Sequence, residues 1–207
     1  DFSKKRSQHA SCYVNDAFGT AHRAHASTTV VAKYFENKFF GKLLEKEVLA
    51  LNKVMSNGAS PILAVLGGSK ISSKTPIIEN IIDKVDDIII GGGMSFTFIK
   101  ALGGKIGSSI HEDSMTEKAL SILELAEQKN TKIHLPVDVV CAKEFKEGAE
   151  SKIFAIDSIS DEYEGLDSGP KSLEKFKKII MSSKTILWNG PAIPRVYPCK
   201  NSLSVFK

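Results

Sequence analysis

The sequence contains few cysteines, and none is spaced for metal binding or cross-linking. Its three cysteines, Cys12, Cys141 and Cys199, are odd in number and form no Cys-x-x-Cys pair. This spacing argues against a disulfide framework and against a zinc site, and it favours a reducing compartment. Cys12 and Cys141 lie within apolar runs, so we expect both thiols to be buried and unreactive.

Long apolar runs and a strong charge excess are also absent. No stretch approaches the length of a membrane span, and the first residues, Asp1–Arg6, contain no hydrophobic signal core. The net charge of +4 over 207 residues is too small for a typical nucleic-acid binder, although it suits anionic small ligands. We therefore expect neither a membrane nor nucleic acid as a partner. The missing initial Met is typical of a processed or trimmed chain.

Two common nucleotide-binding motifs are not matched. The glycines Gly91-Gly92-Gly93 follow the apolar run Ile88–Ile90, but the third glycine of G-x-G-x-x-G would fall at Phe96. The turn Leu66–Lys74 does not have the spacing G-x-x-x-x-G-K-[ST] either. The sequence thus argues against a Rossmann dehydrogenase and against a Walker A loop.

From Pro61 onward, apolar runs alternate with amphipathic stretches, which predicts an α/β fold with a doubly wound parallel sheet. Strands are expected at Ile62–Leu66, Asp87–Ile90, Lys132–Val140 and Thr185–Trp188. Helices are expected at Ser73–Lys84, Met94–Leu102, Ser114–Lys129 and Ser172–Ser182, the third of them with a capping box formed by Ser114 and Glu117. Several strands end in glycine or proline, and we expect these ends to gather around one crevice.

The first sixty residues follow a different pattern. A strand is expected at Cys12–Asn15, and an amphipathic helix at Gly41–Ser56 ends at Asn57-Gly58. One strand and one helix cannot bury a core. This part must therefore lean on another structure or be the remnant of another domain.

Lys70 and Lys74 follow the glycines Gly67-Gly68 directly after the apolar run Ile62–Leu66. Glycines allow backbone to approach a ligand, and two ammonium groups one helical turn apart, beside free backbone amides, suit a polyphosphate. The alternative is an ordinary strand-to-helix turn with solvated lysines.

Three other polar positions have both a functional and a structural interpretation. In the loop Asn15–His25, Arg23 with His22 can hold a phosphate or carboxylate, or the loop is a surface loop with a helix-capping Asp. The spacing of its histidines argues against a metal site. Asn189 points outward at a strand end or only stabilises its own turn. Asp138, in an apolar run, is interpreted as a cap and is assigned no chemistry.

Six ordered segments closely resemble the phosphoglycerate kinase family: Tyr13–His25, Leu66–Lys70, Gly91–Met94, Leu135–Asp138, Gly165–Pro170 and Trp188–Pro191. The resemblance implies reversible phosphoryl transfer between 1,3-bisphosphoglycerate and ADP, giving 3-phosphoglycerate and ATP in glycolysis. It also implies a hinge enzyme whose N-terminal domain holds the glycerate and whose C-terminal, Rossmann-like domain holds the nucleotide with Mg²⁺.

The resemblance also implies the role of each site residue. Lys70 and Lys74 are the implied catalytic residues, and His22 and Arg23 are implied to bind 3-phosphoglycerate. The implied nucleotide site consists of Gly68, Ser69, Lys70, Lys74, Gly92, Gly93, Gly165, Leu166, Asn189, Gly190 and Pro191. No residue is implied as a metal ligand, because the family's aspartate for magnesium is missing and the ion is held mainly by the nucleotide.

The chain departs from the family in extent. We expect a remnant of the N-terminal substrate domain over residues 1–40, the interdomain helix over 41–57, an incomplete nucleotide-binding domain over 58–191 and a divergent tail over 192–207. The tail does not follow the family's continuation and is expected to be unstructured or foreign. Ser73 stands where the family has an acidic residue before the second lysine.

These departures predict a chain that is weakly active or inactive alone. The alternative is a non-catalytic nucleotide-binding fragment or an interaction remnant, whose open sheet edges and uncovered apolar helix face drive self-association. The family is usually monomeric. The resemblance favours a cytoplasmic location and leaves a plastid form open.

Overall fold

The computed structural model describes residues 1–21, 23–146 and 148–190. Three features named above therefore lie outside the described residues: His22, Pro191 and the tail Ala192–Lys207. The chain divides into two compact units, unit 1 over residues 1–57 and unit 2 from residue 58 onward. In the described part of the chain, no helix has the length and apolar character needed to cross a membrane.

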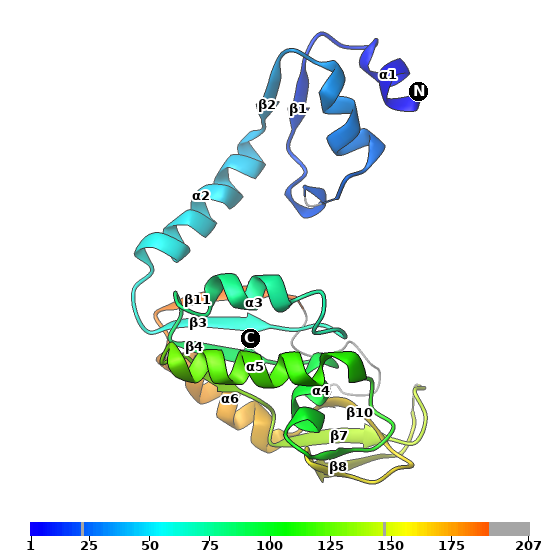
Figure 1. Cartoon of the computed structure of the whole chain (residues 1–207), viewed down its shortest axis with the longest axis vertical. Helices are drawn as coiled ribbons and strands as arrows, with labels where there is room; N and C mark the ends of the chain where they lie inside the picture. Colours follow the sequence, from blue (N-terminus) through cyan, green and yellow to red (C-terminus); the bar gives the residue numbers. More distant parts are fainter. Residues whose placement is uncertain (22, 147, 191–207) are drawn as a thin grey trace. The chain divides into compact units, whose positions relative to one another are not determined.

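Unit 1 has few buried residues. Its helices and strands are α1 (Phe2–Ser7), β1 (Tyr13–Asn15), β2 (Lys38–Phe40) and α2 (Lys42–Asn57) (Figure 1). Short turns of 3₁₀ or π helix occupy Phe18–Thr20, Ala26–Val30 and Val31–Tyr34. The two strands pair in parallel. Among the residues of unit 1 whose burial is described, the buried ones are Ser3, Val31, Phe35 and Leu44.

Cys12 immediately precedes β1 and is exposed, so the expectation that it is buried is wrong. The strand begins only at Tyr13, so Cys12 lies outside the paired segment. An apolar neighbourhood in the sequence does not bury a side chain unless the element it belongs to is covered by another.

Asp16, in the loop Asn15–His25, caps helix α2. Its Oδ1 accepts the backbone N–H of Leu44 at 2.9 Å, which satisfies a free donor at the start of α2. A Cβ added to Gly41 would lie 2.2 Å from Cγ of Asp16, so this approach depends on the glycine. The Asp is a helix cap, as one of the two interpretations predicted.

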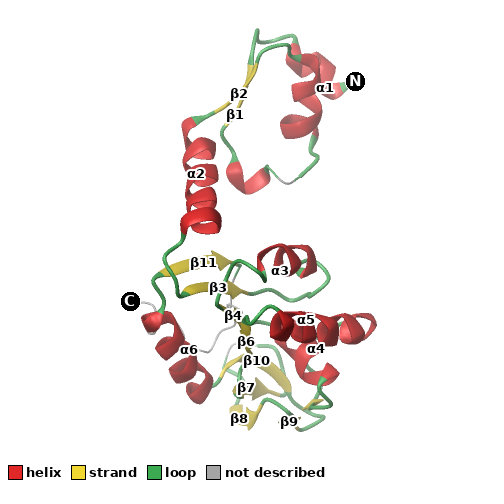
Figure 2. Ribbon diagram, turned by 60° about the vertical axis from the view of Figure 1, so that its left-hand side comes forward, coloured by secondary structure: helices red, strands yellow, loops and turns green. Residues whose placement is uncertain are grey.

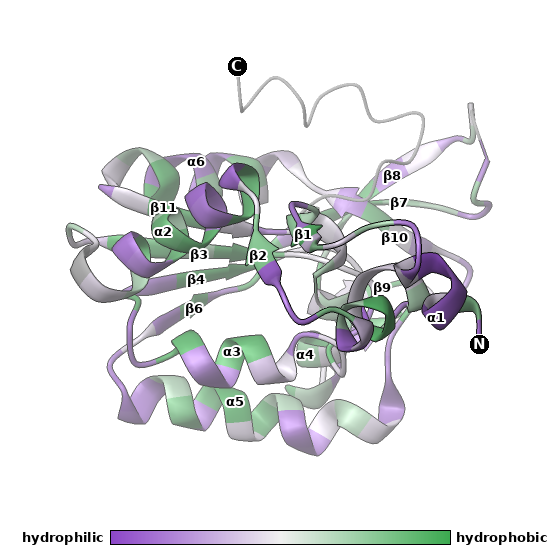
Figure 3. Cartoon of the chain, turned by 90° about the horizontal axis from the view of Figure 1, so that it is seen from above, coloured by the Kyte–Doolittle hydropathy of each residue, from purple (hydrophilic) through white to green (hydrophobic). Residues whose placement is uncertain are grey.

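A four-stranded parallel sheet forms the centre of unit 2. Its strands lie in the order β11, β3, β4, β6, which span Thr185–Asn189, Ile62–Leu66, Asp87–Ile90 and Lys132–His134. Helix α6 (Pro170–Ser182) covers one face, and α3 (Thr75–Ile81) and α5 (Thr116–Gln128) cover the other (Figure 3). The doubly wound α/β fold and the strands predicted at β3, β4 and β11 are confirmed.

The central strands are apolar at almost every position because both faces are covered. Leu63 and Val65 of β3 pack with Ile89 of β4 against Phe176 of α6, and all four are buried. The intervening residue Ala64 is also buried, and so are its neighbours in β4. A continuous apolar run, rather than an alternating one, is typical of a parallel sheet.

A second, antiparallel sheet was not expected from the sequence. Its order is β10, β7, β8, which span Glu164–Ser168, Asp138–Ala142 and Ser151–Ala155 (Figure 2). A further sheet of two parallel strands joins β5 (Lys105–Ile106) to β9 (Ser158–Ile159). The single strand predicted at Lys132–Val140 is wrong, because β6 and β7 belong to different sheets. Pro136 lies between them, and proline cannot donate to a strand ladder.

Two helices begin two residues later in the chain than predicted. Helix α3 begins at Thr75 rather than Ser73, whose hydroxyl instead donates to the Lys70 carbonyl at 3.0 Å. Such local bonds compete with helix formation. Helix α5 begins at Thr116 without a side-chain cap, because Ser114 lies within a 3₁₀ turn at Asp113–Met115. The predicted capping box is therefore wrong, whereas α4 (Met94–Ala101) agrees with its prediction to within one residue.

Asp138 at the start of β7 caps α6 and confirms its structural interpretation. Its two carboxylate oxygens accept the backbone N–H groups of Lys171 and Ser172 at 3.0 and 2.7 Å. The Ser172 hydroxyl lies 2.6 Å from Oδ1 and is fully buried. A Cβ on Gly169 would lie 2.4 Å from Cγ of Asp138, so the glycine leaves space for the carboxylate. This network joins the antiparallel sheet to α6.

Replacing Asp138 by Ala should therefore lower the free energy of unfolding by about 2–4 kcal/mol, because the N–H groups of Lys171 and Ser172 at the start of α6 lose their carboxylate acceptor. Urea unfolding followed by circular dichroism measures this change. The exposed Asp161 is the control, and its replacement by Ala should change the value by less than about 0.5 kcal/mol. Equal effects of the two substitutions would contradict the network's role.

Burial raises the pKa of the Cys141 thiol to about 12 from an ordinary value of 9.0. A thiol with a raised pKa keeps its proton until the pH approaches that value, so little reactive thiolate exists at pH 8. We expect iodoacetamide at pH 8 to modify Cys141 about a thousandfold more slowly than an ordinary thiol, and Cys12 to react first. Peptide mass spectrometry of the native protein measures both rates. Comparable labelling of Cys12 and Cys141 would contradict the burial of Cys141.

Candidate functional site

Three turns meet at the carboxyl edge of the parallel sheet. The turns after β3, β4 and β11 come from adjacent strands, and the sheet order places β11 beside β3 although it is the last strand of the described residues. The chain therefore runs from β3 to β4 on one side and later returns to the other side of β3 as β11. Ligands in open α/β sheets bind at such a reversal of strand order.

Glycine backbones allow these turns to touch. Gly92 has φ of 69°, and a Cβ there would lie 2.8 Å from the carbonyl oxygen of Gly68. Gly190 has φ of 86°, and its Cβ would lie 2.6 Å from the carbonyl oxygen of Gly67. Any side chain at either position would push the turns apart. A Cβ on Gly93 would likewise lie 3.2 Å from Cα of Ser69.

Backbone hydrogen bonds hold the same turns together. The Gly67 N–H donates to the Asn189 carbonyl at 3.1 Å, and the Met94 N–H donates to the Gly68 carbonyl at 3.0 Å. The first bond joins the end of β11 to the turn after β3, and the second joins that turn to α4. The structure therefore brings the predicted residues Gly68, Ser69, Gly92, Gly93, Asn189 and Gly190 into one place.

Lys74 crosses this junction. Its Nζ donates to Oδ1 of Asn189 at 2.5 Å, and it would lie 3.6 Å from a Cβ on Gly190. Lys74 is half-buried, whereas Lys70 is exposed. The predicted spacing of one helical turn between the two lysines does not form, because α3 begins only after Lys74 and contains neither lysine.

The predicted free amides beside the lysines are partly wrong. The Ser72 N–H donates to Oε2 of Glu112 at 2.9 Å, and the Lys74 N–H donates to the Ile71 carbonyl at 2.9 Å. These two donors are already satisfied. A phosphate at this turn would depend mainly on the ammonium groups.

A pocket opens beside Gly92 on the side of the antiparallel sheet. It is lined by Gly92, Ser95, Phe96, Pro136, Val139, Ile156, Leu166, Asp167 and Ser168. Of the predicted residues, Leu166 lines it directly, and Gly165 lies against the Phe96 ring, where a Cβ would be 2.1 Å from Cζ. The pairing of β10 with β7 shifts register between Gly165 and Asp167. Such a bulge redirects the side chain of Leu166.

The turns and the pocket share Gly92 and have different chemistry. The turns present bare backbone and ammonium groups, which suit phosphate oxygens. The pocket is mostly apolar, with a buried carboxylate from Asp167 whose Oδ1 accepts the Ser168 N–H at 2.7 Å. An apolar group joined to a chain of phosphates would match both properties.

Arg23 belongs to unit 1 and is exposed. The carbonyl of Arg23 accepts the hydroxyls of Thr28 and Thr29 at 3.1 and 3.0 Å, and the Arg23 N–H donates to the Thr20 carbonyl at 3.0 Å. These bonds order the backbone around the predicted glycerate residue. His22, the other predicted residue, lies outside the described part of the chain.

Sequence reasoning missed Ser95, Asp167 and Glu112. Asp167 lies within the segment Gly165–Pro170, which resembles the family. Its position next to Leu166 was therefore the signal that could have identified it. Ser95 follows the three glycines, and its hydroxyl donates to the Gly92 carbonyl at 2.7 Å. Glu112 has no motif around it. Among the described residues, no group of three or more His, Cys, Asp or Glu side chains could hold a metal ion.

The chain is similar to known proteins over nearly all of its length. A model of the family "Phosphoglycerate kinase" matches residues 1–192. The phosphoglycerate kinases of Porphyromonas gingivalis and Finegoldia magna are each 49% identical, over 193 and 190 residues. Each match covers 92% of this chain, and 46% and 48% of the respective relative. The chain thus spans about half the length of these relatives.

Solved structures give the same result. The phosphoglycerate kinase of Coxiella burnetii matches with a TM-score of 0.77 at 41% identity, covering 92% of this chain and 49% of that one. The enzyme from Pyrococcus horikoshii matches with a TM-score of 0.75 at 28% identity, covering 92% and 48%. The family match over residues 1–192 and the shared fold agree with the resemblance of the six ordered segments, and the chain belongs to the phosphoglycerate kinase family.

Proposed function

We propose that this chain carries the nucleotide half of the phosphoglycerate kinase reaction, the reversible transfer of a phosphoryl group between 1,3-bisphosphoglycerate and ADP. The observation that carries the proposal is the meeting of three glycine turns beside Lys74 at the reversal of strand order. ADP or ATP is the ligand, with its phosphates at the turns and its base in the neighbouring pocket.

The roles follow from this placement. Lys70 and Lys74 contact the phosphates and stabilise charge on the phosphoryl group in transit, since phosphoryl transfer depends mainly on positioning and electrostatic stabilisation. Gly68, Ser69, Asn189 and Gly190, with Pro191, border the phosphates. Gly92, Gly93, Gly165 and Leu166 line the ribose and base side. Arg23 and His22 bind 3-phosphoglycerate, and α2 is the interdomain helix.

Magnesium is implied by the family, but the described residues do not form a site for it. No cluster of three or more candidate ligand side chains occurs among them. Lys70 and Lys74 are cations and cannot coordinate it. We assign no metal ligand among these residues and propose that the ion is held mainly by the nucleotide phosphates.

The proposed setting is the cytoplasm, where a glycolytic enzyme acts on small-molecule substrates, and a plastid form is the alternative. In the proposed domain assignment, residues 1–40 are a remnant of the substrate domain, 41–57 the interdomain helix, 58–191 the nucleotide-binding part and 192–207 a divergent tail. The boundary between units after residue 57 supports this division.

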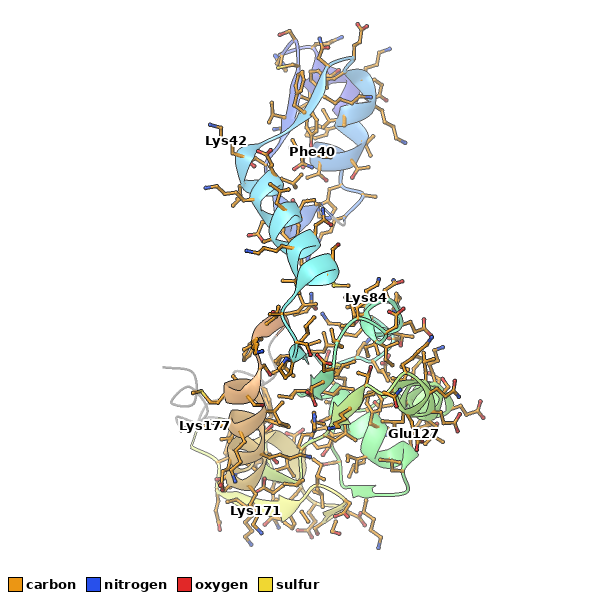
Figure 4. All side chains as sticks on the ribbon, turned by 90° about the vertical axis from the view of Figure 1, so that its left-hand side faces the viewer. Phe40, Lys42, Lys84, Glu127, Lys171 and Lys177 are labelled. Carbon is orange, nitrogen blue, oxygen red and sulfur yellow. The ribbon has the colours of Figure 1, made fainter. Side chains whose placement is uncertain are left out.

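ADP with Mg²⁺ should bind the folded chain, and replacing Lys74 by Met should weaken binding about tenfold, because the half-buried ammonium at the turns is lost. Isothermal calorimetry measures both affinities. The control is Lys84→Met, at an exposed lysine just after α3 (Figure 4), which should leave the affinity unchanged. No binding by the folded wild-type chain would overturn the proposed nucleotide site.

The chain alone should show negligible turnover in a coupled assay with 3-phosphoglycerate and ATP. It spans about half of its relatives, and misplacement of a substrate by about 1 Å already costs about two orders of magnitude in rate. The assay is run beside an intact relative at equal concentration. A turnover near that of the relative would contradict this prediction and show that the substrate site is complete.

Self-association is a second property that a specific observation favours. Phe39 and Phe40 of β2 are 57% and 76% exposed, and Leu49 of α2 is 60% exposed. Exposed apolar side chains on a strand and an adjoining helix are typical of a surface that another chain covers. Size-exclusion chromatography with light scattering should show a concentration-dependent mass. The mass of a single chain at all concentrations would contradict this expectation.

A further inference from the structure

Residues 109–113, which we call the bridging segment, join the two parts of the candidate site. The Ser109 hydroxyl accepts the Gly165 N–H at 2.8 Å, which fixes the segment to β10 at the base pocket. The Glu112 N–H donates to Oγ1 of Thr97 on α4 at 3.1 Å. Ser109 and Thr97 are buried, so these bonds lie away from water. The segment is thus attached to two elements that contribute residues to the pocket.

A cluster around Lys100 holds the same segment on α4. Nδ1 of His111 lies 2.9 Å from the Ser109 carbonyl, which only accepts, so Nδ1 carries a proton. Nε2 lies 2.8 Å from Nζ of Lys100 and 3.3 Å from Oδ1 of Asp113, and Nζ also lies 2.6 Å from Oδ1 of Asp113. These contacts surround Glu112 on both sides in the chain and restrict where its backbone can lie.

The Glu112 carboxylate reaches from this segment to residues 67–74, which we call the lysine turn. Oε2 accepts the Ser72 N–H at 2.9 Å and Oε1 accepts the Ser72 hydroxyl at 2.7 Å. The Ser72 hydroxyl and amide, and to a smaller extent the charge of Lys70, lower the pKa of Glu112. The carboxylate therefore stays ionised at neutral pH and keeps both hydrogen bonds.

Backbone bonds to Asn189 and Met94 hold the glycine end of the lysine turn, and Glu112 holds the part that follows it. The turn begins with Gly67 and Gly68, and glycine has the largest conformational freedom of any residue. An unsupported turn would lose that freedom when a ligand binds, which costs affinity. Ser73 stands where the resemblance expects an acidic residue, so the local sequence provides no carboxylate of its own.

We propose that Glu112 is a positioning residue for the lysine turn. Glu112 holds Ser72 and thereby sets the direction of Lys70 relative to Gly92 and to the apolar pocket proposed for the base. Glu112 acts through Ser72 and does not contact the nucleotide. This inference rests on the proposed nucleotide site only for its effect on ligand binding. The contact itself can be tested without any ligand.

The first experiment measures the turn in the nucleotide-free protein. Water-exchange NMR should show the Ser72 amide exchanging about tenfold faster in Glu112→Ala than in the wild type, because its acceptor is lost. The matched control is Glu127→Ala, at an exposed position on α5 (Figure 4), which should leave the exchange unchanged. Unchanged exchange in Glu112→Ala would overturn the proposal.

The second experiment separates positioning from a general effect on stability. Amide chemical-shift titrations with ADP and with adenosine should show ADP affinity falling about tenfold in Glu112→Ala, with adenosine affinity unchanged, because only ADP carries the phosphates. Glu112→Gln keeps the shape of the side chain but not its charge. Its ADP affinity should lie between those of the wild type and Glu112→Ala. Equal losses for ADP and adenosine, or no loss for ADP, would contradict a positioning role.

The two experiments distinguish this proposal from the proposed function. If the wild-type chain binds neither ligand, the proposed nucleotide site fails, and the exchange rate alone then decides whether Glu112 holds the turn. In the double variant Glu112→Ala with Ser72→Ala, the loss of ADP affinity should be smaller than the sum of the single losses, since both act through one contact. Additive losses would overturn the inference.

Discussion

Close contact between bare backbones at the ends of three parallel strands is the constraint on which the site depends. Gly92 and Gly190 lie against the carbonyls of Gly68 and Gly67, and both have positive φ angles that residues with side chains rarely adopt. Since the turns touch there, Lys74 can reach Asn189 across them. The glycines therefore decide both the shape of the crevice and the place of its half-buried cation.

The antiparallel sheet supplies the other wall, and its attachment is polar. Asp138 and Ser172 join β7 to α6 through buried hydrogen bonds, and Ser109 joins β10 to the bridging segment. A register shift in β10 directs Leu166 to the pocket. The apolar pocket and the lysine turn thus belong to one hydrogen-bonded frame that runs through Glu112.

Sequence patterns predicted the parts of unit 2 that are buried on both faces. The runs at β3 and β4 are bounded as predicted, because a strand covered by helices on both sides must be apolar throughout. The pattern failed where tertiary contacts compete with local preference. Pro136 separates two strands that read as one run, and Ser73 bonds locally instead of starting α3. Cys12 has apolar neighbours in sequence but no cover in space.

The sequence by itself determined the family, the doubly wound sheet and the glycine and lysine positions, because these depend on residue type at fixed spacing along the chain. Only the tertiary structure decided which groups meet. Glu112 is forty residues from Ser72, and Asp138 is thirty-four from Ser172, so no local pattern relates either pair. Their contacts depend on how the strands are ordered and how the helices return to the sheet, and sequence spacing does not encode these distances.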